Sequence, residues 1–173
     1  PWPTLTKRLM GFQPEDLTTI VAKSGVGKTF LLILILLEAW KAGKKVLLVS
    51  TEMKYPSLMM RCAAFVCKLS YSRMRSGELS SIEKNLFTEV FKELKHDNRF
   101  ILFGEGFDVS FEQVESVLLE YKPALVGIDG AYLLNSVKIK SYNEAEKIAQ
   151  VWTQLKSLAK RNKVPIVSIS QMN

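Results

Sequence analysis

Hydrophobic and polar positions follow two patterns that take turns along this chain. Short, continuous apolar runs predict β-strands that are buried on both faces, because such strands have no polar side. These runs lie at residues 17–21, 45–50, 99–104, 124–129 and 165–170. Between them, apolar residues recur every three or four positions, which predicts amphipathic helices.

The helices have recognisable start and stop signals. The first is expected at residues 28–42, with Gly43 as a natural stop, and the second at residues 57–69. Three more begin with a serine that is followed three residues later by a glutamate or glutamine, so that the two side chains can cap the first turn. The three pairs are Ser80 with Glu83, Ser110 with Gln113, and Ser141 with Glu144.

Strands that alternate with helices form a mostly parallel sheet with helices on both faces. The sequence therefore predicts a three-layer α/β domain. Domains of this kind bind ligands beyond the carboxyl ends of their strands, so functional residues are expected at those positions.

Composition is that of an ordinary globular protein. The 173 residues suffice for one domain with a full hydrophobic core, and 47% of them are hydrophobic and 24% charged. The longest apolar run, residues 30–37, is far shorter than the roughly 20 residues that cross a bilayer, so no membrane association is expected. The first residues lack the features of a signal peptide, which predicts a cytoplasmic protein.

Charge and cysteine content narrow the function only slightly. A net charge of +7 is compatible with a polyanionic partner such as nucleic acid, but the lysines and arginines are dispersed along the chain. Cys62, Cys67 and the single histidine, His96, do not make up a zinc site. We interpret the two cysteines as buried thiols in a reducing compartment.

The stretch "VAKSGVGKTF" lies between the first strand and the first helix. It fits the phosphate-binding pattern G-x-x-x-x-G-K-[ST], except that Ala22 replaces the first glycine. The glycines free the backbone so that N–H groups can point at a phosphate, and the following helix adds its positive end. Lys28 would reach the β- and γ-phosphates of ATP, and the Thr29 hydroxyl would bind Mg²⁺. The alternative is a plain glycine turn. The predicted nucleotide-binding residues are Ser24, Gly25, Val26, Gly27, Lys28 and Thr29.

Three more polar residues lie at the ends of other predicted strands. Asp129 ends one strand and is the natural second ligand of the metal, or else caps the turn at Gly130. Glu52 follows another strand and would be the base that polarises the attacking water, or else a first-turn glutamate of the next helix. Gln171 directly follows the last strand, where its amide would contact the γ-phosphate, or else is a solvated loop residue. Together these residues suggest ATP hydrolysis coupled to movement.

Five stretches of this sequence resemble the ATPase domain of DnaB-type hexameric replicative helicases, which has the RecA fold. They are "GFQPEDLTTIVAKSGVGKT", "VLLVSTEM", "MMRCAAFVCKLSYSRMRSGELS", "LVGIDGAYLL" and "LKSLAKRNKVPIVSISQMN". The resemblance extends almost from end to end and includes the alanine in place of the first glycine. It implies a RecA-like P-loop NTPase in which Glu52 is the catalytic glutamate, Asp129 the Walker B metal ligand and Gln171 the phosphate sensor.

The resemblance also implies a cellular role. It implies Mg²⁺ and ATP as cofactors, single-stranded DNA as substrate, a homohexameric ring, and primase and a helicase loader as partners, in the cytoplasm of a bacterium or of a phage-infected host. The loop "NSVKIKSYN" would face the central channel, where Lys138 and Lys140 would follow the DNA backbone. A solvated lysine loop is the alternative for these two residues.

Two departures from the family pattern stand out. The family usually has a tyrosine directly after the Walker B aspartate, whereas here Tyr132 stands three residues after Asp129, as a divergent, phage-encoded branch would explain. In the family, later strands and the arginine finger that each subunit supplies to its neighbour lie beyond the position that corresponds to Asn173. The resemblance therefore implies that residues 1–173 are one RecA-like ATPase domain and a C-terminally incomplete fragment of a longer helicase, with no residue assigned as the finger.

Two other functions remain open at this level. A RecA-fold recombinase would form a filament on DNA rather than a ring, and a signalling or assembly ATPase of the same fold would not touch nucleic acid. The fold hosts all three functions and does not choose between them.

Overall fold

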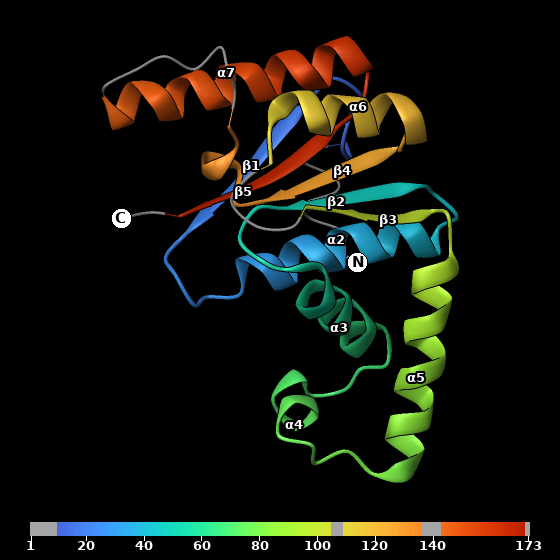
Figure 1. Ribbon diagram of the computed structural model, residues 1–173. Coiled ribbons are helices and arrows are strands. Elements are labelled where there is room, and N and C mark those ends of the chain that lie inside the picture. The colour runs from blue at the N-terminus through green and yellow to red at the C-terminus, as the bar shows by residue number, and fades with distance from the viewer. Residues whose placement is uncertain (1–9, 105–108, 136–142, 172–173) are drawn as a thin grey trace.

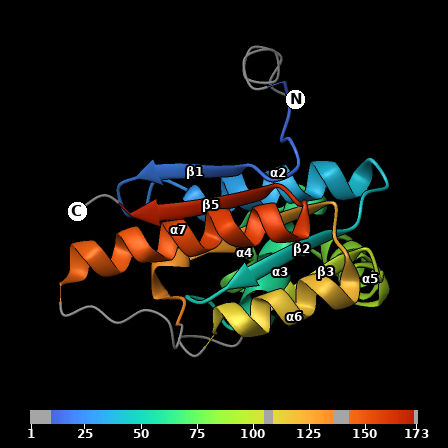
Figure 2. The same cartoon turned by 90° about the horizontal axis from the view of Figure 1, so that it is seen from above.

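The computed structural model describes residues 10–104, 109–135 and 143–171. Within this part of the chain, five strands form one sheet in which every neighbouring pair is parallel. The strand order is β1-β5-β4-β2-β3, and the arrowheads of β1, β5 and β2 point to the same side in Figure 2. The strands are β1 (Leu17–Ala22), β2 (Val46–Ser50), β3 (Phe100–Phe103), β4 (Leu125–Asp129) and β5 (Ile166–Gln171).

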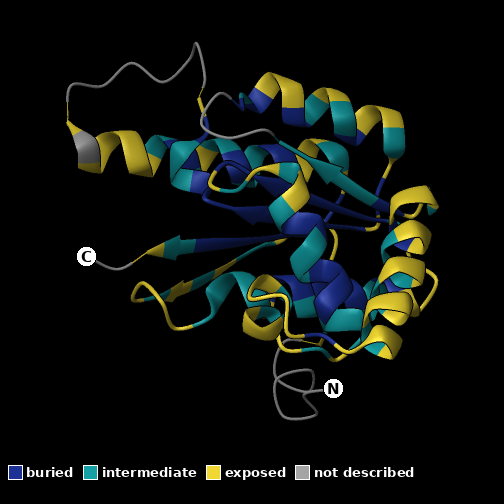
Figure 3. Cartoon of the chain, turned by 60° about the horizontal axis from the view of Figure 1, so that its bottom comes forward, coloured by how far each residue is buried: buried dark blue, intermediate teal, exposed yellow. Residues whose placement is uncertain are grey.

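Helices cover both faces of the sheet, which confirms the predicted three-layer α/β architecture (Figure 1). One face carries α2 (Lys28–Lys41), α3 (Tyr55–Val66) and α5 (Ser81–His96), with the short α4 (Tyr71–Arg75) between the last two. The other face carries α6 (Phe111–Tyr121) and α7 (Glu144–Asn162), and the 3₁₀ turn η1 (Ala131–Leu133) follows β4. Figure 3 shows the buried strands between helices whose outer faces are exposed. Of the helices in the described ranges, none combines the length and the apolarity that crossing a membrane requires.

The central helix α2 packs tightly on β4 because the strand carries a glycine at the contact. A Cβ atom built on Gly127 would come within 2.6 Å of a Leu36 methyl carbon and 3.1 Å of one on Leu32. Both leucines are fully buried, so neither can move aside without disturbing the core. This close packing fixes the start of α2 relative to the end of β4, and both border the site described below.

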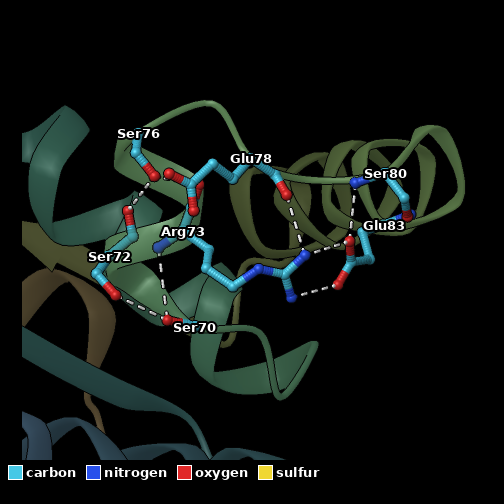
Figure 4. A network of polar contacts seen from close by, with 7 residues as sticks. All are labelled: Ser70, Ser72, Arg73, Ser76, Glu78, Ser80 and Glu83. Atoms are coloured by element: carbon cyan, nitrogen blue, oxygen red, sulfur yellow. Dashed lines mark hydrogen bonds and ion pairs between the residues drawn. The ribbon is translucent and has the colours of Figure 1, made fainter.

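A polar network joins α4 to α5 (Figure 4). The Arg73 guanidinium donates to both carboxylate oxygens of Glu83, at 3.1 and 3.2 Å, and to the Glu78 carbonyl at 3.0 Å. Glu83 also accepts from the Ser80 backbone N–H at 2.8 Å and thereby completes the capping box that was predicted for α5. These contacts lower the pKa of the Glu83 carboxyl group, mainly through the Ser80 N–H and Arg73. The second predicted capping box, Ser110 with Gln113, is also present.

Most of the predicted bounds differ from the observed ones by only one residue, but two predictions about helices were wrong. The predicted helix at 57–69 ends at Val66, because Lys68 takes a left-handed conformation (φ 56°), and the separate helix α4 follows. The predicted cap of α7, Ser141 with Glu144, was also wrong, because Asn143 caps the helix instead by accepting from the Ala145 N–H at 3.0 Å. Asparagine is as good an N-cap as serine. Ser141 itself lies outside the described residues.

Candidate functional site

A cavity of about 330 Å³ lies at the carboxyl ends of the central strands. Because β1, β5, β4 and β2 are consecutive in the sheet, the segments that follow them meet there. The loop after β1 and the end of β5 lie on the same side of the molecule, at the left in Figure 1. The lining residues are Ser24, Gly25, Gly27, Lys28, Thr29, Phe30, Glu52, Arg61, Tyr132, Ile169, Ser170 and Gln171.

The loop between β1 and α2 has a backbone suited to binding an anion. Gly25 and Gly27 both have positive φ angles, 78° and 93°, which side-chain-bearing residues rarely adopt. No side chain caps the start of α2, and its first turn carries no acidic residue, so the N–H groups there remain available to a ligand. Val26, which was predicted to take part, is exposed and does not line the cavity.

The Lys28 ammonium group lies inside this loop. Its Nζ donates to the backbone carbonyls of Ala22, at 2.8 Å, and Lys23, at 2.7 Å. Both acceptors are neutral, so a phosphate that entered the cavity would offer the ammonium group a stronger, charged partner. The lysine is thus held at the cavity in a position from which it can transfer to a bound anion.

Asp129 lies beneath the cavity and is fully buried at the end of β4. Neither of its carboxylate oxygens has a hydrogen bond of standard geometry to the described residues, so it does not cap the turn at Gly130. Burial raises the pKa of the carboxyl group to about 6, and the nearby Glu52 charge adds to the rise. The Thr29 hydroxyl, Arg61 and Lys28 lie close enough to offset part of it. A buried carboxylate without a well-formed hydrogen bond is costly and is typical of a site that binds a ligand.

Glu52 and Gln171 reach the cavity from different strands. Glu52 lies in the bend after β2, and α3 begins only at Tyr55, so the alternative of a first-turn glutamate is wrong. Its Oε1 accepts a hydrogen bond of 2.6 Å from the Tyr132 hydroxyl. Gln171 was expected just past the last strand, but it is the final residue of β5 and pairs with Ala22.

The residues present fit a magnesium ion. Asp129 offers two unpartnered carboxylate oxygens beside the Thr29 hydroxyl, and Mg²⁺ prefers oxygen ligands. The described residues contain no cluster of three or more His, Cys, Asp or Glu side chains that could hold a metal ion alone. Such a donor set is suited to an ion that also takes ligands from substrate phosphates and water.

Arg61 and Tyr132 are two of the cavity residues for which the sequence predicted no role. The Arg61 guanidinium carbon lies 5.2 Å from the Phe30 ring centre and 5.0 Å from that of Tyr71, which places the cation within cation–π distance of both aromatic rings. Tyr132 reaches the cavity from the turn η1 after β4. The sequence contains a signal for Tyr132, its place three residues after Asp129, but no signal that pairs Arg61 with distant rings.

The two lysines predicted to bind DNA, Lys138 and Lys140, lie outside the described residues. Their role stays a prediction from the sequence.

Comparisons with known proteins agree with this geometry. The sequence pattern of the family "DnaB-like helicase C terminal domain" matches residues 2–173. The chain is 29% identical to the replicative DNA helicase DnaB of Haemophilus influenzae, 30% identical to DnaB of Buchnera aphidicola subsp. Schizaphis graminum, and 26% identical to the replicative DNA helicase DnaC of Bacillus subtilis. Each match covers 98% of this chain but only 37% or 38% of the relative.

Two solved structures have the same fold. One is of a DnaB-like replicative helicase and its interactions with primase, and the other is of an ATPase domain. Both superpose with a TM-score of 0.86 at 19% identity over 99% of this chain, and over 42% and 62% of their own chains. Because the family pattern covers nearly all of its residues, this chain belongs to the family of DnaB-like helicase C-terminal domains.

Proposed function

We propose that this chain is the ATP-hydrolysing motor domain of a replicative DNA helicase, which translocates on single-stranded DNA as a homohexameric ring and unwinds duplex DNA. One observation carries the proposal: Lys28, Glu52 and Gln171, from three separate strand ends, line one cavity above the buried Asp129. Membership of the DnaB-like family and the names of the relatives support the same function.

Each side chain has a distinct task in the proposed reaction. The loop N–H groups and Lys28 bind the phosphates of ATP. The Glu52 carboxylate accepts a proton from a water molecule while the water oxygen bonds to the γ-phosphorus and the bond from that phosphorus to the bridging oxygen breaks, which gives ADP and phosphate. The Gln171 amide contacts the γ-phosphate and loses that contact when phosphate leaves.

Thr29 and Asp129 are the residues that would hold Mg²⁺. A bound Mg²⁺ would neutralise the phosphate charge that develops during the reaction. The protein's own part is to keep a buried carboxylate without other partners in the place where that ion is needed.

The cellular setting belongs to the same proposal. We infer that the complete protein is longer than this domain, acts in the cytoplasm, and works with primase and a helicase loader. The lengths of the relatives and the primase named with one related structure support this inference. The family resemblance also places the arginine that completes each ATP site on a neighbouring subunit, so activity is best measured on the full-length protein.

ATP hydrolysis by the full-length protein, with and without single-stranded DNA, tests the proposal. We expect DNA to stimulate hydrolysis several-fold, Lys28→Ala to reduce hydrolysis at least ~100-fold, and Glu52→Gln to spare nucleotide binding but reduce hydrolysis at least ~100-fold. Normal hydrolysis in Glu52→Gln would contradict the role of Glu52. Hydrolysis that is indifferent to DNA would instead favour a signalling or assembly ATPase.

A second measurement separates the helicase from a recombinase of the same fold. Electron microscopy of the full-length protein with ATP and single-stranded DNA should show closed rings. Filaments along the DNA would contradict the proposal and favour the recombinase.

A further inference from the structure

Tyr132 and Glu52 form one short contact across the cavity. The Tyr132 hydroxyl donates to Glu52 Oε1 at 2.6 Å, although the two residues are 80 positions apart in the sequence. This length is in the range of charge-assisted O–H···O⁻ hydrogen bonds, which are roughly twice as strong as neutral ones. Among the described residues, Tyr132 is the one hydrogen-bonding partner of the Glu52 carboxylate.

The backbone on both sides of this contact is held in place. Thr51, the residue before Glu52, donates from its backbone N–H to the Asp129 carbonyl at 3.0 Å and from its hydroxyl to the Gly130 carbonyl at 2.7 Å. Gly130 has a φ of 83°, and a Cβ atom there would collide with the Thr51 hydroxyl. The bend after β2 and the turn after β4 are therefore fixed to each other, and Tyr132 follows the second of them.

Without the phenol, the Glu52 side chain would be free to move. It is exposed, and a glutamate loses about 1.5–2 kcal/mol of rotamer entropy when it is confined to one conformation. The hydrogen bond occupies one carboxylate oxygen and leaves Oε2 available to a water molecule in the cavity. Burial and the Glu52 carboxylate raise the pKa of Tyr132 to about 12, so the phenol remains a donor in neutral solution.

We propose that Tyr132 is the positioning residue of Glu52: its hydroxyl holds the carboxylate so that Oε2 faces the water that attacks ATP. This inference rests on the proposed function, in which Glu52 is the base. Tyr132 itself neither takes nor gives up a proton in the reaction. Its task is to reduce the number of conformations that the Glu52 side chain samples before its carboxylate can act as the base.

The test uses the full-length protein and two matched variants. Tyr132→Phe removes the hydroxyl and keeps the ring. Tyr121→Phe is the control, because the Tyr121 hydroxyl also lies near a glutamate, Glu120, but Tyr121 is on α6, away from the cavity. We expect Tyr132→Phe to lower the kcat of ATP hydrolysis ~10-fold, with the KM and the Kd of a fluorescent ATP analogue unchanged within ~twofold. Tyr121→Phe should match the wild type.

Combining variants shows whether Tyr132 acts through Glu52. In single-turnover hydrolysis, Tyr132→Phe should have no further effect in a Glu52→Gln background. A wild-type kcat in Tyr132→Phe, a loss of nucleotide affinity equal to the loss of kcat, or an undiminished ~10-fold effect in the Glu52→Gln background would each overturn the inference. Normal hydrolysis in Glu52→Gln alone would instead overturn the proposed role of Glu52, so the two failures are distinguishable.

Discussion

Two aspartates at opposite ends of the sheet have contrasting surroundings. Asp129, at the carboxyl end of β4, is fully buried without a hydrogen-bond partner among the described residues, and its pKa is raised to about 6 by burial. Asp97 precedes β3 at the amino end. It accepts from the Trp40 indole at 2.8 Å and from Arg99 at 2.7, 2.8 and 3.1 Å, and its pKa is lowered to about 2, mainly by the Arg99 side chain.

The contrast extends to the other buried polar groups. Among the described residues, buried side-chain polar atoms without a partner belong to Arg61, Asp129 and Ser168, and the first two lie at the cavity. Folding normally satisfies such groups, as it does at Asp97. One end of the sheet is thus arranged for stability, whereas the other keeps charges available for a ligand at a cost in stability.

The largest expected effect comes from Asp129→Asn. The amide keeps the shape of the carboxylate but removes its charge, so metal-dependent hydrolysis should fall at least ~100-fold. The free energy of unfolding without nucleotide should stay the same or rise, by up to about 2 kcal/mol, because the desolvation cost of this buried charge exceeds what the nearby Arg61 and Lys28 charges offset. Steady-state hydrolysis and urea unfolding measure the two effects. A destabilised variant would show that Asp129 supports the fold, and the proposed difference between Asp129 and Asp97 would then be wrong.

Asp97→Ala should give the reverse result. It leaves the buried Trp40 N–H without an acceptor, which should cost about 1–3 kcal/mol in urea unfolding, while hydrolysis changes less than ~twofold. Asp16→Ala is a suitable control, since the Asp16 carboxylate is exposed and pairs with Lys156 at 3.3 Å. That pair should contribute less than about 1 kcal/mol. Equal effects of both variants would mean that Asp97 is an ordinary surface carboxylate.

The pH dependence of stability tests whether the Asp97 carboxylate stabilises the fold through its ion pair with Arg99. Its folded pKa, about 2, lies below the ordinary value of 3.8 that applies to the unfolded chain. The unfolded chain therefore binds the proton more readily, so the stabilisation is fully present above the unfolded pKa and is lost as the pH falls through about 2. The difference in free energy of unfolding between wild type and Asp97→Asn should shrink as the pH falls from about 5 to about 2. A constant difference would contradict the role of the Arg99 ion pair.

The sequence predicts the five strands and the starts of α5 and α6 well, because apolar runs and capping pairs are local signals. The phosphate loop, Glu52, Asp129 and Gln171 could be placed at one edge from the parallel topology alone. What it could not reveal are contacts between distant segments: nothing local joins Tyr132 to Glu52, or Arg61 to Phe30 and Tyr71. The start of α7 was misplaced for a related reason, since serine and asparagine are equally good caps and only the fold selects Asn143.

Ser168 has the smallest expected effect, and it tests whether only groups at the cavity are left unpaired for function. Its hydroxyl is fully buried in β5 and has no partner among the described residues, yet Ser168 does not line the cavity. If only groups at the cavity are kept unpaired for function, Ser168→Ala should leave hydrolysis unchanged and raise the free energy of unfolding by up to about 1 kcal/mol, because an unsatisfied hydroxyl is removed at little change in volume. Urea unfolding and steady-state hydrolysis check this. A stable variant with impaired hydrolysis would extend the functional end of the sheet into the middle of β5.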